Sequence, residues 1–177
     1  MSEAARDAAI DALLDKQAIY EVLVKYCRGA DRGDADLIAE CYHPDAHENH
    51  GGTFDGSAEA YVSMLRKVLP TAGRMTHLIT NILIELDGHA AQTECYILTF
   101  SRRGEGTDEA YDSLTLARLI DDFEKRDGAW KIARRRLAWE WNHEMPYRET
   151  WGRGMIAPDP AALVRGGKKP NDILYGS

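Results

Sequence analysis

The chain has 177 residues, 44% of them hydrophobic, which is enough to bury one sizeable core in a single domain. Its formal net charge of −7 argues against a nucleic acid or an anionic membrane as partner, since both select for clustered Lys and Arg. No apolar stretch approaches the ~20 residues that span a bilayer, and the N-terminus is charged, so we expect a cytoplasmic protein. The cysteines are odd in number, and we expect them to be reduced, buried thiols.

Two helices are predicted at the start of the chain. From Ala8 to Tyr26, apolar residues recur at spacings of three and four, which is typical of an amphipathic helix. Gly29 is placed to end this helix in the left-handed conformation. Asp34 is then predicted to cap a second, short helix that ends before Pro44.

Residues 45–56 are predicted as a turn-rich loop. The His-x-x-His spacing of His47 and His50 in this loop suggests a metal site, but two imidazoles do not make a closed or catalytic one. A solvated loop or a pocket rim is the alternative, with His50 as a polar contact at the pocket mouth. Ser57 then opens a third helix that stops at Pro70.

The second half of the chain is predicted to form strands. Four segments are rich in β-branched and aromatic residues: His77–Leu86, Ala90–Arg102, Glu109–Arg126 and Ala129–Asn142. The Asp87-Gly88 and Asp127-Gly128 pairs mark tight hairpins between neighbouring segments. Three helices followed by a meander of long strands indicate an α+β fold, and the lack of β-α alternation excludes a doubly wound sheet.

The last segment, residues 143–177, differs in composition from the rest. It holds most of the prolines, many glycines and two late aromatic residues, Trp151 and Tyr175. We expect an extended arm that packs on a neighbouring subunit or closes the mouth of its own pocket, with disorder at its end as an alternative.

Asp31 and His77 are the leading candidates for catalysis. An aspartate that orients a histidine in a closed pocket makes a general base without a metal or a cofactor. The alternatives are structural roles: a hydrogen-bonded core histidine at position 77, and a helix cap or turn at Asp31. Asp34 is better placed as the cap, which leaves Asp31 free for His77. Tyr26, on the apolar face of the first helix, is either a functional hydroxyl or plain core.

Strict alternation along the first strand places Asn81 on the same face as His77. Asn81 would then orient a substrate oxygen, with a satisfied core amide as the alternative. Alternation places Leu78, Ile82 and Ile84 on the other face. Since large apolar patches are rarely left in water, this outer face predicts self-association through the sheet.

On the last strand, unbroken alternation gives Arg135 the same face as Trp139 and Trp141. An arginine beside two indoles suits an aromatic or anionic ligand through stacking and charge-assisted hydrogen bonds. The alternative is an ion pair within the sheet, with Glu94 or Glu124 as the partner of Arg135.

Several motifs, in this order and spacing, resemble one protein family. They are Tyr26 and Asp31 in KYCRGADRGD, Tyr42 to Ala46 in CYHPDAHENHG, His77 and Asn81 in THLITN, Glu94 and Tyr96 in QTECY, and Arg118 to Glu124 in ARLIDDFEKRDGAWKIARR. Over about residues 8–142 the chain resembles the SnoaL-like branch of the nuclear transport factor 2-like superfamily. That branch contains scytalone dehydratase, bile-acid 7α-dehydratase, a hexachlorocyclohexane dehydrochlorinase and a lyase of diarylpropane diols.

The resemblance implies an α+β cone over residues 1–142, with three helices packed on a strongly curved, mainly antiparallel sheet and an arm over residues 143–177. Inside the cone, Asp31 would hold His77, His77 would take a proton from a substrate carbon, and Tyr26 would bind or polarise the substrate. Arg135 matches an arginine that recurs on the last strand of such lyases. The other expected substrate-binding residues are Asn81, His50, Tyr96 and Trp139.

The expected activity is a cofactor-independent elimination of the dehydratase type, with or without loss of a one-carbon unit, and without a metal. The expected substrate is a hydroxylated aromatic or polycyclic small molecule, and the expected assembly is a homotrimer rather than a dimer. The alternatives are an isomerase or cyclase of the same fold, or a non-catalytic ligand-binding or ring-hydroxylating dioxygenase β-like subunit. The discriminating feature is an Asp31–His77 contact inside an enclosed cavity, because a scaffold has no need of a buried acid–base pair.

Overall fold

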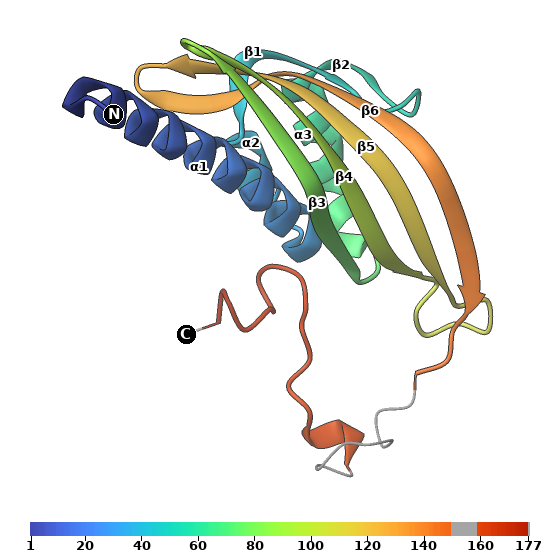
Figure 1. Ribbon diagram of the computed structural model, residues 1–177. Helices are drawn as coiled ribbons and strands as arrows, with labels where there is room; N and C mark the ends of the chain where they lie inside the picture. The colour runs from blue at the N-terminus through green and yellow to red at the C-terminus, as the bar shows by residue number, and fades with distance from the viewer. Residues whose placement is uncertain (150–158, 177) are drawn as a thin grey trace.

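The computed structural model describes residues 1–149 and 159–176 (Figure 1). The helices are α1 (Glu3–Arg32), α2 (Ala35–Ala39) and α3 (Ala58–Val68), with short 3-10 turns at Leu69–Thr71 and Pro160–Ala162. The strands are β1 (Tyr42–Asn49), β2 (Asp55–Ser57), β3 (Met75–Asp87), β4 (Ala90–Arg103), β5 (Tyr111–Arg126) and β6 (Ala129–Pro146). The predicted α+β class is confirmed.

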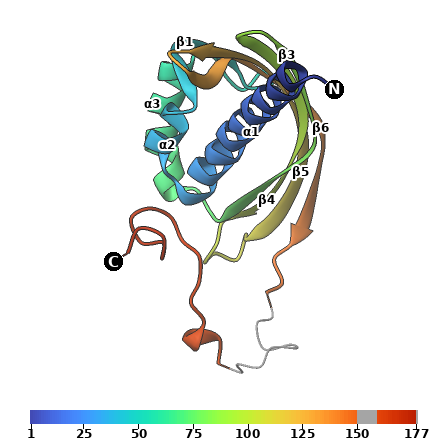
Figure 2. The same cartoon turned by 60° about the vertical axis from the view of Figure 1, so that its left-hand side comes forward.

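One six-stranded sheet carries the fold, in the order β2-β1-β6-β5-β4-β3. Strand β1 runs parallel to β6, and the other pairings are antiparallel. The long strands curve around α1 and α3, which lie on the concave side of the sheet (Figures 1 and 2). The predicted hairpins at Asp87-Gly88 and Asp127-Gly128 are confirmed, and φ is positive at both glycines.

The prediction of a loop over residues 45–56 is wrong. Most of β1 and most of β2 lie there, and β1 forms the parallel pairing with β6. These strands are short and carry charged and Gly residues, which hide the alternation that marks a strand. Their presence turns Glu48 toward the interior, where it is fully buried.

The first helix is longer than its apolar pattern predicts. Ser2 caps its N-terminus, and Gly33, at φ 68°, caps its C-terminus in the left-handed conformation. Gly29 therefore does not end the helix. A Cβ at Gly29 would lie 2.6 Å from Cγ1 of Ile38, so this glycine allows α1 and α2 to pack closely. Asp31 consequently lies in the last turn of α1 rather than beyond it.

The two other helices begin where their capping residues predict. The Asp34 carboxylate accepts a hydrogen bond from the backbone N–H of Leu37 at the start of α2. The Ser57 hydroxyl accepts one from the backbone N–H of Ala60 at the start of α3. Both contacts satisfy amide groups that have no partner within the helix.

A bulge in β3 overturns the predicted alternation of that strand. The register with β4 shifts between Thr80 and Leu83, and Asn81 adopts a positive φ of 52°. The extra residue reverses the faces beyond this point. Ile82 and Ile84 therefore pack against the core, and Leu83 is 57% exposed instead. Their prediction as outer-face residues is wrong, and that of Leu78, which is 48% exposed, is confirmed.

Strand β6 carries two such irregularities against β5. One lies opposite Asp122 and Phe123 and turns Arg135 into the interior. The other lies opposite Leu116 and Ala117, so that Trp139 and Trp141 point to opposite faces. The prediction that both indoles share the face of Arg135 is therefore wrong for Trp141.

The core lies between the concave face of the sheet and the helices. All three cysteines are buried and unpaired, and burial raises the pKa of each thiol to about 12. The thiols therefore stay protonated at neutral pH and behave as small apolar groups. No helix in the described part of the chain is long and apolar enough to cross a membrane.

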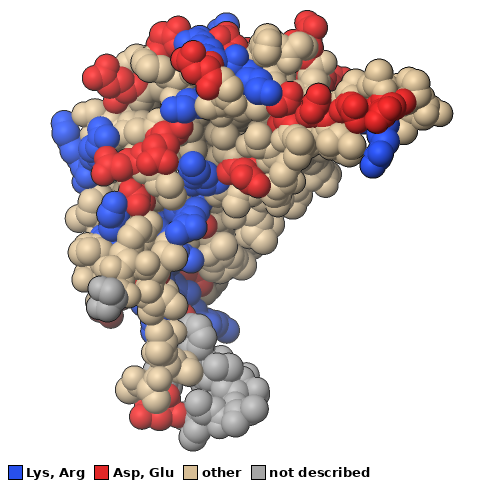
Figure 3. All heavy atoms as spheres, turned by 90° about the vertical axis from the view of Figure 1, so that its left-hand side faces the viewer, with Lys and Arg blue, Asp and Glu red and all other residues tan. Residues whose placement is uncertain are grey.

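After β6, residues 159–176 return to the C-terminal end of α1 (Figure 2). The backbone N–H of Lys169 donates to the carbonyl of Arg32 at 2.7 Å, and its ammonium contacts both carboxylate oxygens of Asp34 at 3.1 Å. Trp151 lies outside the described residues. On the face that Figure 3 presents, Lys and Arg are interspersed with Asp and Glu, so this face offers no extended basic surface to a polyanion.

Candidate active site

A cavity of about 190 Å³ lies inside the cone, between α1 and the concave face of the sheet. Ile97, Ala117, Leu119 and Leu137 make its apolar wall, and Thr99, Ser101, Thr115 and Arg103 add polar groups. Tyr26, His50, His77 and Trp139 complete the lining with Met75. At ~30 Å³ of liquid volume per molecule, the cavity has room for roughly six waters.

Asp31 and His77 meet at the wall of this cavity. Their side chains are 12% and 15% exposed, and Nδ1 of His77 lies 2.6 Å from Oδ1 of Asp31. Strand β3 is at the edge of the sheet, and the backbone N–H of His77 donates to both oxygens of Asp31 at 3.1 Å. These hydrogen bonds fix the ring. Because Asp31 accepts at Nδ1, the neutral imidazole carries its hydrogen there, and Nε2 is the basic atom that remains for the cavity.

Tyr26 lines the same cavity from α1. Its hydroxyl lies 3.1 Å from the hydroxyl of Tyr61 on α3. Burial raises the pKa of both tyrosines, with the neighbouring acidic groups acting in the same direction. Tyr26 is therefore a hydrogen-bond donor at neutral pH and not a base.

His50, just after β1, belongs to a hydrogen-bonded cluster. Its Nδ1 lies 2.8 Å from Oε1 of Glu48 and 3.2 Å from the Tyr61 hydroxyl. Its ring stacks on that of Tyr61, and the edge of Trp139 completes the enclosure at 5.8 Å between centroids. Sequence reasoning missed Glu48 and Tyr61, because Glu48 was assigned to a loop and Tyr61 is one of several apolar-face residues of a helix.

Trp139 reaches the cavity because of Gly51. The indole N–H donates to the carbonyl of Gly51 at 3.0 Å. Gly51 has a positive φ of 58°, and a Cβ there would lie 2.5 Å from Nε1 of Trp139. Only glycine combines that backbone conformation with so close an approach.

Arg135 lies behind the cavity wall rather than in the cavity lining. It is fully buried, with Nε and Nη2 bonded to Asp121 at 2.8 and 2.6 Å. Its guanidinium also stacks over the Tyr26 ring, 4.2 Å from the centroid. The ion-pair alternative for Arg135 therefore fits the structure, but with Asp121 as partner in place of Glu94 or Glu124. Although burial opposes the charge, Asp121 holds the pKa of Arg135 above its ordinary value.

The structure does not bring Asn81 and Tyr96 to the cavity. Asn81 is exposed at the bulge of β3, and Tyr96 lies on the face of β4 opposite to the buried Cys95 and Ile97. Both expectations rested on alternation or on motif matching. Arg103, at the end of β4, lines the cavity and was not predicted; its place beside a polar hairpin gave no signal.

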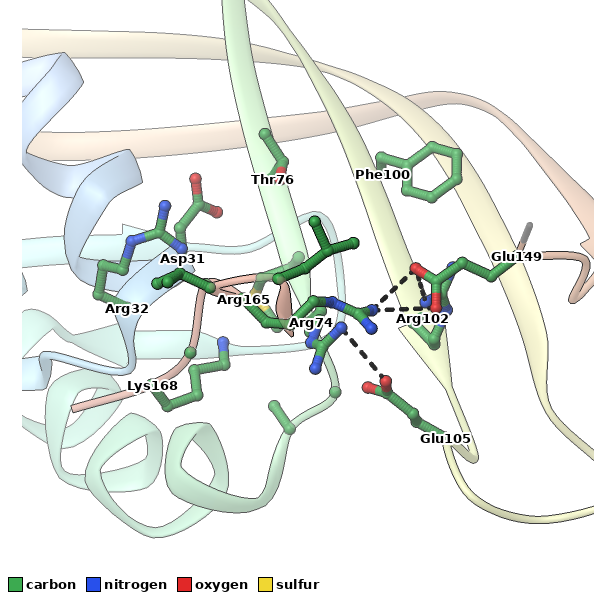
Figure 4. A pocket seen from close by; sticks show the side chains of 17 residues that line it. Asp31, Arg32, Arg74, Thr76, Phe100, Arg102, Glu105, Glu149, Arg165 and Lys168 are labelled. Carbon is green, nitrogen blue, oxygen red and sulfur yellow. Dashed lines mark hydrogen bonds and ion pairs between the residues drawn. The ribbon is translucent and has the colours of Figure 1, made fainter. Parts of the chain in front are cut away.

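A second, larger pocket of about 670 Å³ lies beside the edge of β3 and is closed by the C-terminal arm (Figure 4). Asp31 lines this pocket, whereas His77 lines the cone cavity. Lys168 of the arm lies here, with its ammonium 3.2 Å from the carbonyl of Ala30. Burial lowers the pKa of Lys168, and the negative charge of Asp31 partly opposes this effect. The arm thus brings a cation to the rear of the Asp31–His77 pair.

Within residues 1–149 and 159–176, the structure contains no group of three or more His, Cys, Asp or Glu side chains that could hold a metal ion. The loop histidines separate: His47 faces Asp55 at 3.1 Å, and His50 faces Glu48.

Known proteins share this architecture. A candidate scytalone dehydratase from Novosphingobium aromaticivorans is 21% identical with a TM-score of 0.68, and the match covers 77% of this chain and 91% of the other. The hexachlorocyclohexane dehydrochlorinase LinA-type3 from Novosphingobium barchaimii is 19% identical with a TM-score of 0.69, over 80% and 99% of the two chains. At these identities the likeness shows the fold alone.

A third solved structure and a family match complete the comparison. An NTF2-like protein with a cystatin-like fold from Novosphingobium aromaticivorans is 21% identical with a TM-score of 0.63, over 78% and 90% of the two chains. No curated protein matches the chain significantly. The SnoaL-like domain family matches residues 11–136, which is more than half of the sequence. The chain therefore belongs to the SnoaL-like domain family.

Proposed function

We propose that this protein is a cofactor-independent lyase that eliminates water from a small hydroxylated aromatic compound. The observation that carries the proposal is the 2.6 Å contact between Asp31 and His77, whose ring lines the cavity. A carboxylate that orients an imidazole stabilises the imidazolium that forms when the ring takes a proton. General-base action of this kind contributes about 10²–10⁴-fold in rate.

In the proposed reaction, Nε2 of His77 removes a proton from a carbon next to an electron-withdrawing group. Negative charge then develops on a substrate oxygen, and the Tyr26 hydroxyl is the donor available to it in the cavity. The apolar wall excludes water and strengthens these electrostatic contacts.

The size and lining of the cavity support one class of substrate. Its 190 Å³ is below the ~300–1,000 Å³ of pockets that hold drug-sized ligands, which favours a single aromatic ring over a polycycle. Trp139 and the His50 ring supply aromatic surface, and Thr99 and Thr115 supply hydroxyls for polar substituents. Loss of a one-carbon unit after elimination would require a hydroxymethyl group beside the reacting carbon.

The test separates proton removal from elimination. The protein is incubated in D₂O with single-ring β-hydroxy aryl ketones. NMR follows exchange of the carbon-bound proton for deuterium, and absorbance follows the new conjugated double bond. We expect both signals with the unaltered protein, and a loss of about 10²–10⁴-fold in both with His77→Ala. His143→Ala, which removes an exposed histidine from β6, is the matched control and should change neither.

Other outcomes identify the alternatives. Exchange followed by return of the proton to another carbon would indicate that the protein is an isomerase and not a lyase. Ligand binding with neither exchange nor elimination across the panel would indicate a non-catalytic binding or scaffold subunit. Equal loss of activity in His77→Ala and His143→Ala would contradict the role given to His77.

A further inference from the structure

The cavity is lined by a second carboxylate–imidazole pair, formed by Glu48 and His50. Glu48 is fully buried, and its Oε1 lies 2.8 Å from Nδ1 of His50. The Tyr42 hydroxyl donates to the other oxygen, Oε2, at 2.6 Å. As in the Asp31–His77 pair, the carboxylate engages Nδ1, and Nε2 of the ring remains for the cavity. The rings of Tyr61 and Trp139 hold the imidazole in place.

The charges around Glu48 differ from those around Asp31. Three side chains with 0% exposure lie next to one another on adjacent strands: Asp121 on β5, Arg135 on β6 and Glu48 on β1, paired in register. Arg135 binds Asp121 through Nε and Nη2, and its Nη1 has no hydrogen-bond partner, so this group of three side chains holds one guanidinium and two carboxylates. A buried charge without a partner costs several kcal/mol. The imidazole of His50 is the basic group in direct contact with Glu48.

The other groups that face His50 do not change this balance. Tyr61 and Tyr26 stay neutral because burial raises the pKa of each phenol. Tyr42 is neutral for the same reason. Arg103 lines the cavity from β4 but is exposed to solvent, and His77 faces the cavity from β3.

At Asp31 the balance is different. The ammonium of Lys168 shares a pocket with Asp31, and their charges attract each other (Figure 4). A cation thus accompanies the carboxylate of the Asp31–His77 pair, whereas the basic group in contact with Glu48 is the His50 ring itself. Two pairs of the same composition therefore face one cavity in different charge surroundings, which favours one as the proton acceptor and the other as the proton donor.

We infer that His50 is the general acid of this site and that Glu48 is its positioning residue. The inference rests on the proposed lyase function. In the first step, the substrate C–H bond breaks, its proton goes to Nε2 of His77, and the electron pair is held as the enolate of the neighbouring carbonyl group. In the second step, this pair forms the C=C bond while the C–O bond breaks with its electron pair on oxygen, which takes the proton from Nε2 of His50 and leaves as water. His77 returns its proton to the solvent and His50 regains one, so the cycle balances.

The first experiment compares His50→Gln with the control His47→Gln. His47 is three residues away, pairs with Asp55 and does not line the cavity. We expect His50→Gln to lower elimination by about 10²–10⁴-fold while exchange of the carbon-bound proton in D₂O stays within about threefold of the unaltered protein. His47→Gln should leave both rates unchanged. His77→Ala, in contrast, should lose both.

A second measurement replaces the hydroxyl leaving group by chloride, which departs without a proton. The chloro analogue should restore turnover to His50→Gln but not to His77→Ala. Glu48→Gln should lower elimination of water while proton exchange is retained, and the chloro analogue should restore its turnover. A purely structural defect would lower all three rates together. If Glu48→Gln does not fold, the leaving-group test on His50→Gln decides alone.

Three results would overturn the inference. In the first, His50→Gln eliminates water at the full rate, which refutes the general-acid role of His50 but leaves the lyase function standing. In the second, exchange and elimination fall together in His50→Gln and chloride does not rescue turnover, which makes His50 a structural residue. In the third, the unaltered protein neither exchanges nor eliminates, which refutes the lyase function and this role with it.

Discussion

Replacement of Arg135 separates a structural role from the substrate-binding role that the sequence predicts. Arg135→Met removes both hydrogen bonds to Asp121, at 2.8 and 2.6 Å, and leaves that carboxylate fully buried without a cation. Breaking a buried ion pair by removing one partner costs about 3–5 kcal/mol, a large part of the ~5–15 kcal/mol that stabilises a typical domain. Asp121→Leu should cost a similar amount, since it leaves the guanidinium unpaired.

The double variant Arg135→Met/Asp121→Leu should regain most of that loss, because replacing both members of a buried pair by apolar groups is often neutral or favourable. Urea unfolding of the two single variants and the double variant measures the coupling, provided that the slope m stays constant. If Arg135→Met unfolds at the same urea concentration as the unaltered protein but has a raised KM, this reasoning is refuted and Arg135 is a substrate-binding residue.

Three further predictions concern the dyad, the arm and assembly. Asp31→Asn should lower carbon-bound proton exchange by a factor comparable to that of His77→Ala, because an amide cannot stabilise the imidazolium; exchange at the unaltered rate would contradict the dyad. Hydrogen bonds from the amides of Gly167 and Leu174 lower the pKa of Asp172 below its ordinary 3.8, so its contribution to arm docking is complete above about pH 3.8 and is lost as pH falls through the folded value. Hydrogen exchange at those two amides should therefore accelerate only in acid, and unchanged protection at pH 2 would refute the assignment. The exposed apolar outer face, with Leu78 and Phe100, predicts a homotrimer of the 19.8 kDa chain, which Phe100→Lys should dissociate; light scattering that gives ~20 kDa for the unaltered protein would exclude it.

Local sequence signals predicted the elements whose boundaries depend on local chemistry. Asp34 and Ser57 are N-caps, the two Asp-Gly pairs are hairpin turns, and the strand segments lie where β-branched residues gather. The Asp31–His77 contact joins residues 46 positions apart and came from a family resemblance, not from a local pattern.

The errors in β3 and β6 have one physical origin, which is the register of the strands. A single extra residue at Asn81 reverses every side chain that follows in β3, and no local pattern marks it. The same effect in β6 places Arg135 against Asp121 and separates Trp139 from Trp141. Strand β1 was not predicted, because its pairing with β6 is parallel and joins segments that are distant in sequence. The position of Glu48 in the site was missed for the same reason.

The polar interior distinguishes an enzyme from a scaffold of the same fold. Glu48, Asp121 and Arg135 are all completely buried, in a cone whose remaining wall is apolar. Well-packed apolar residues of similar volume would serve stability at least as well. Arg135 and Asp121 pair with each other, but Glu48 has a direct contact with a histidine that lines a cavity, and a second histidine, held by Asp31, lines the same cavity. A binding module needs complementary hydrogen bonds but no separated acid and base. Two imidazoles, each held by a carboxylate and facing one small cavity, are what successive proton removal and proton delivery require.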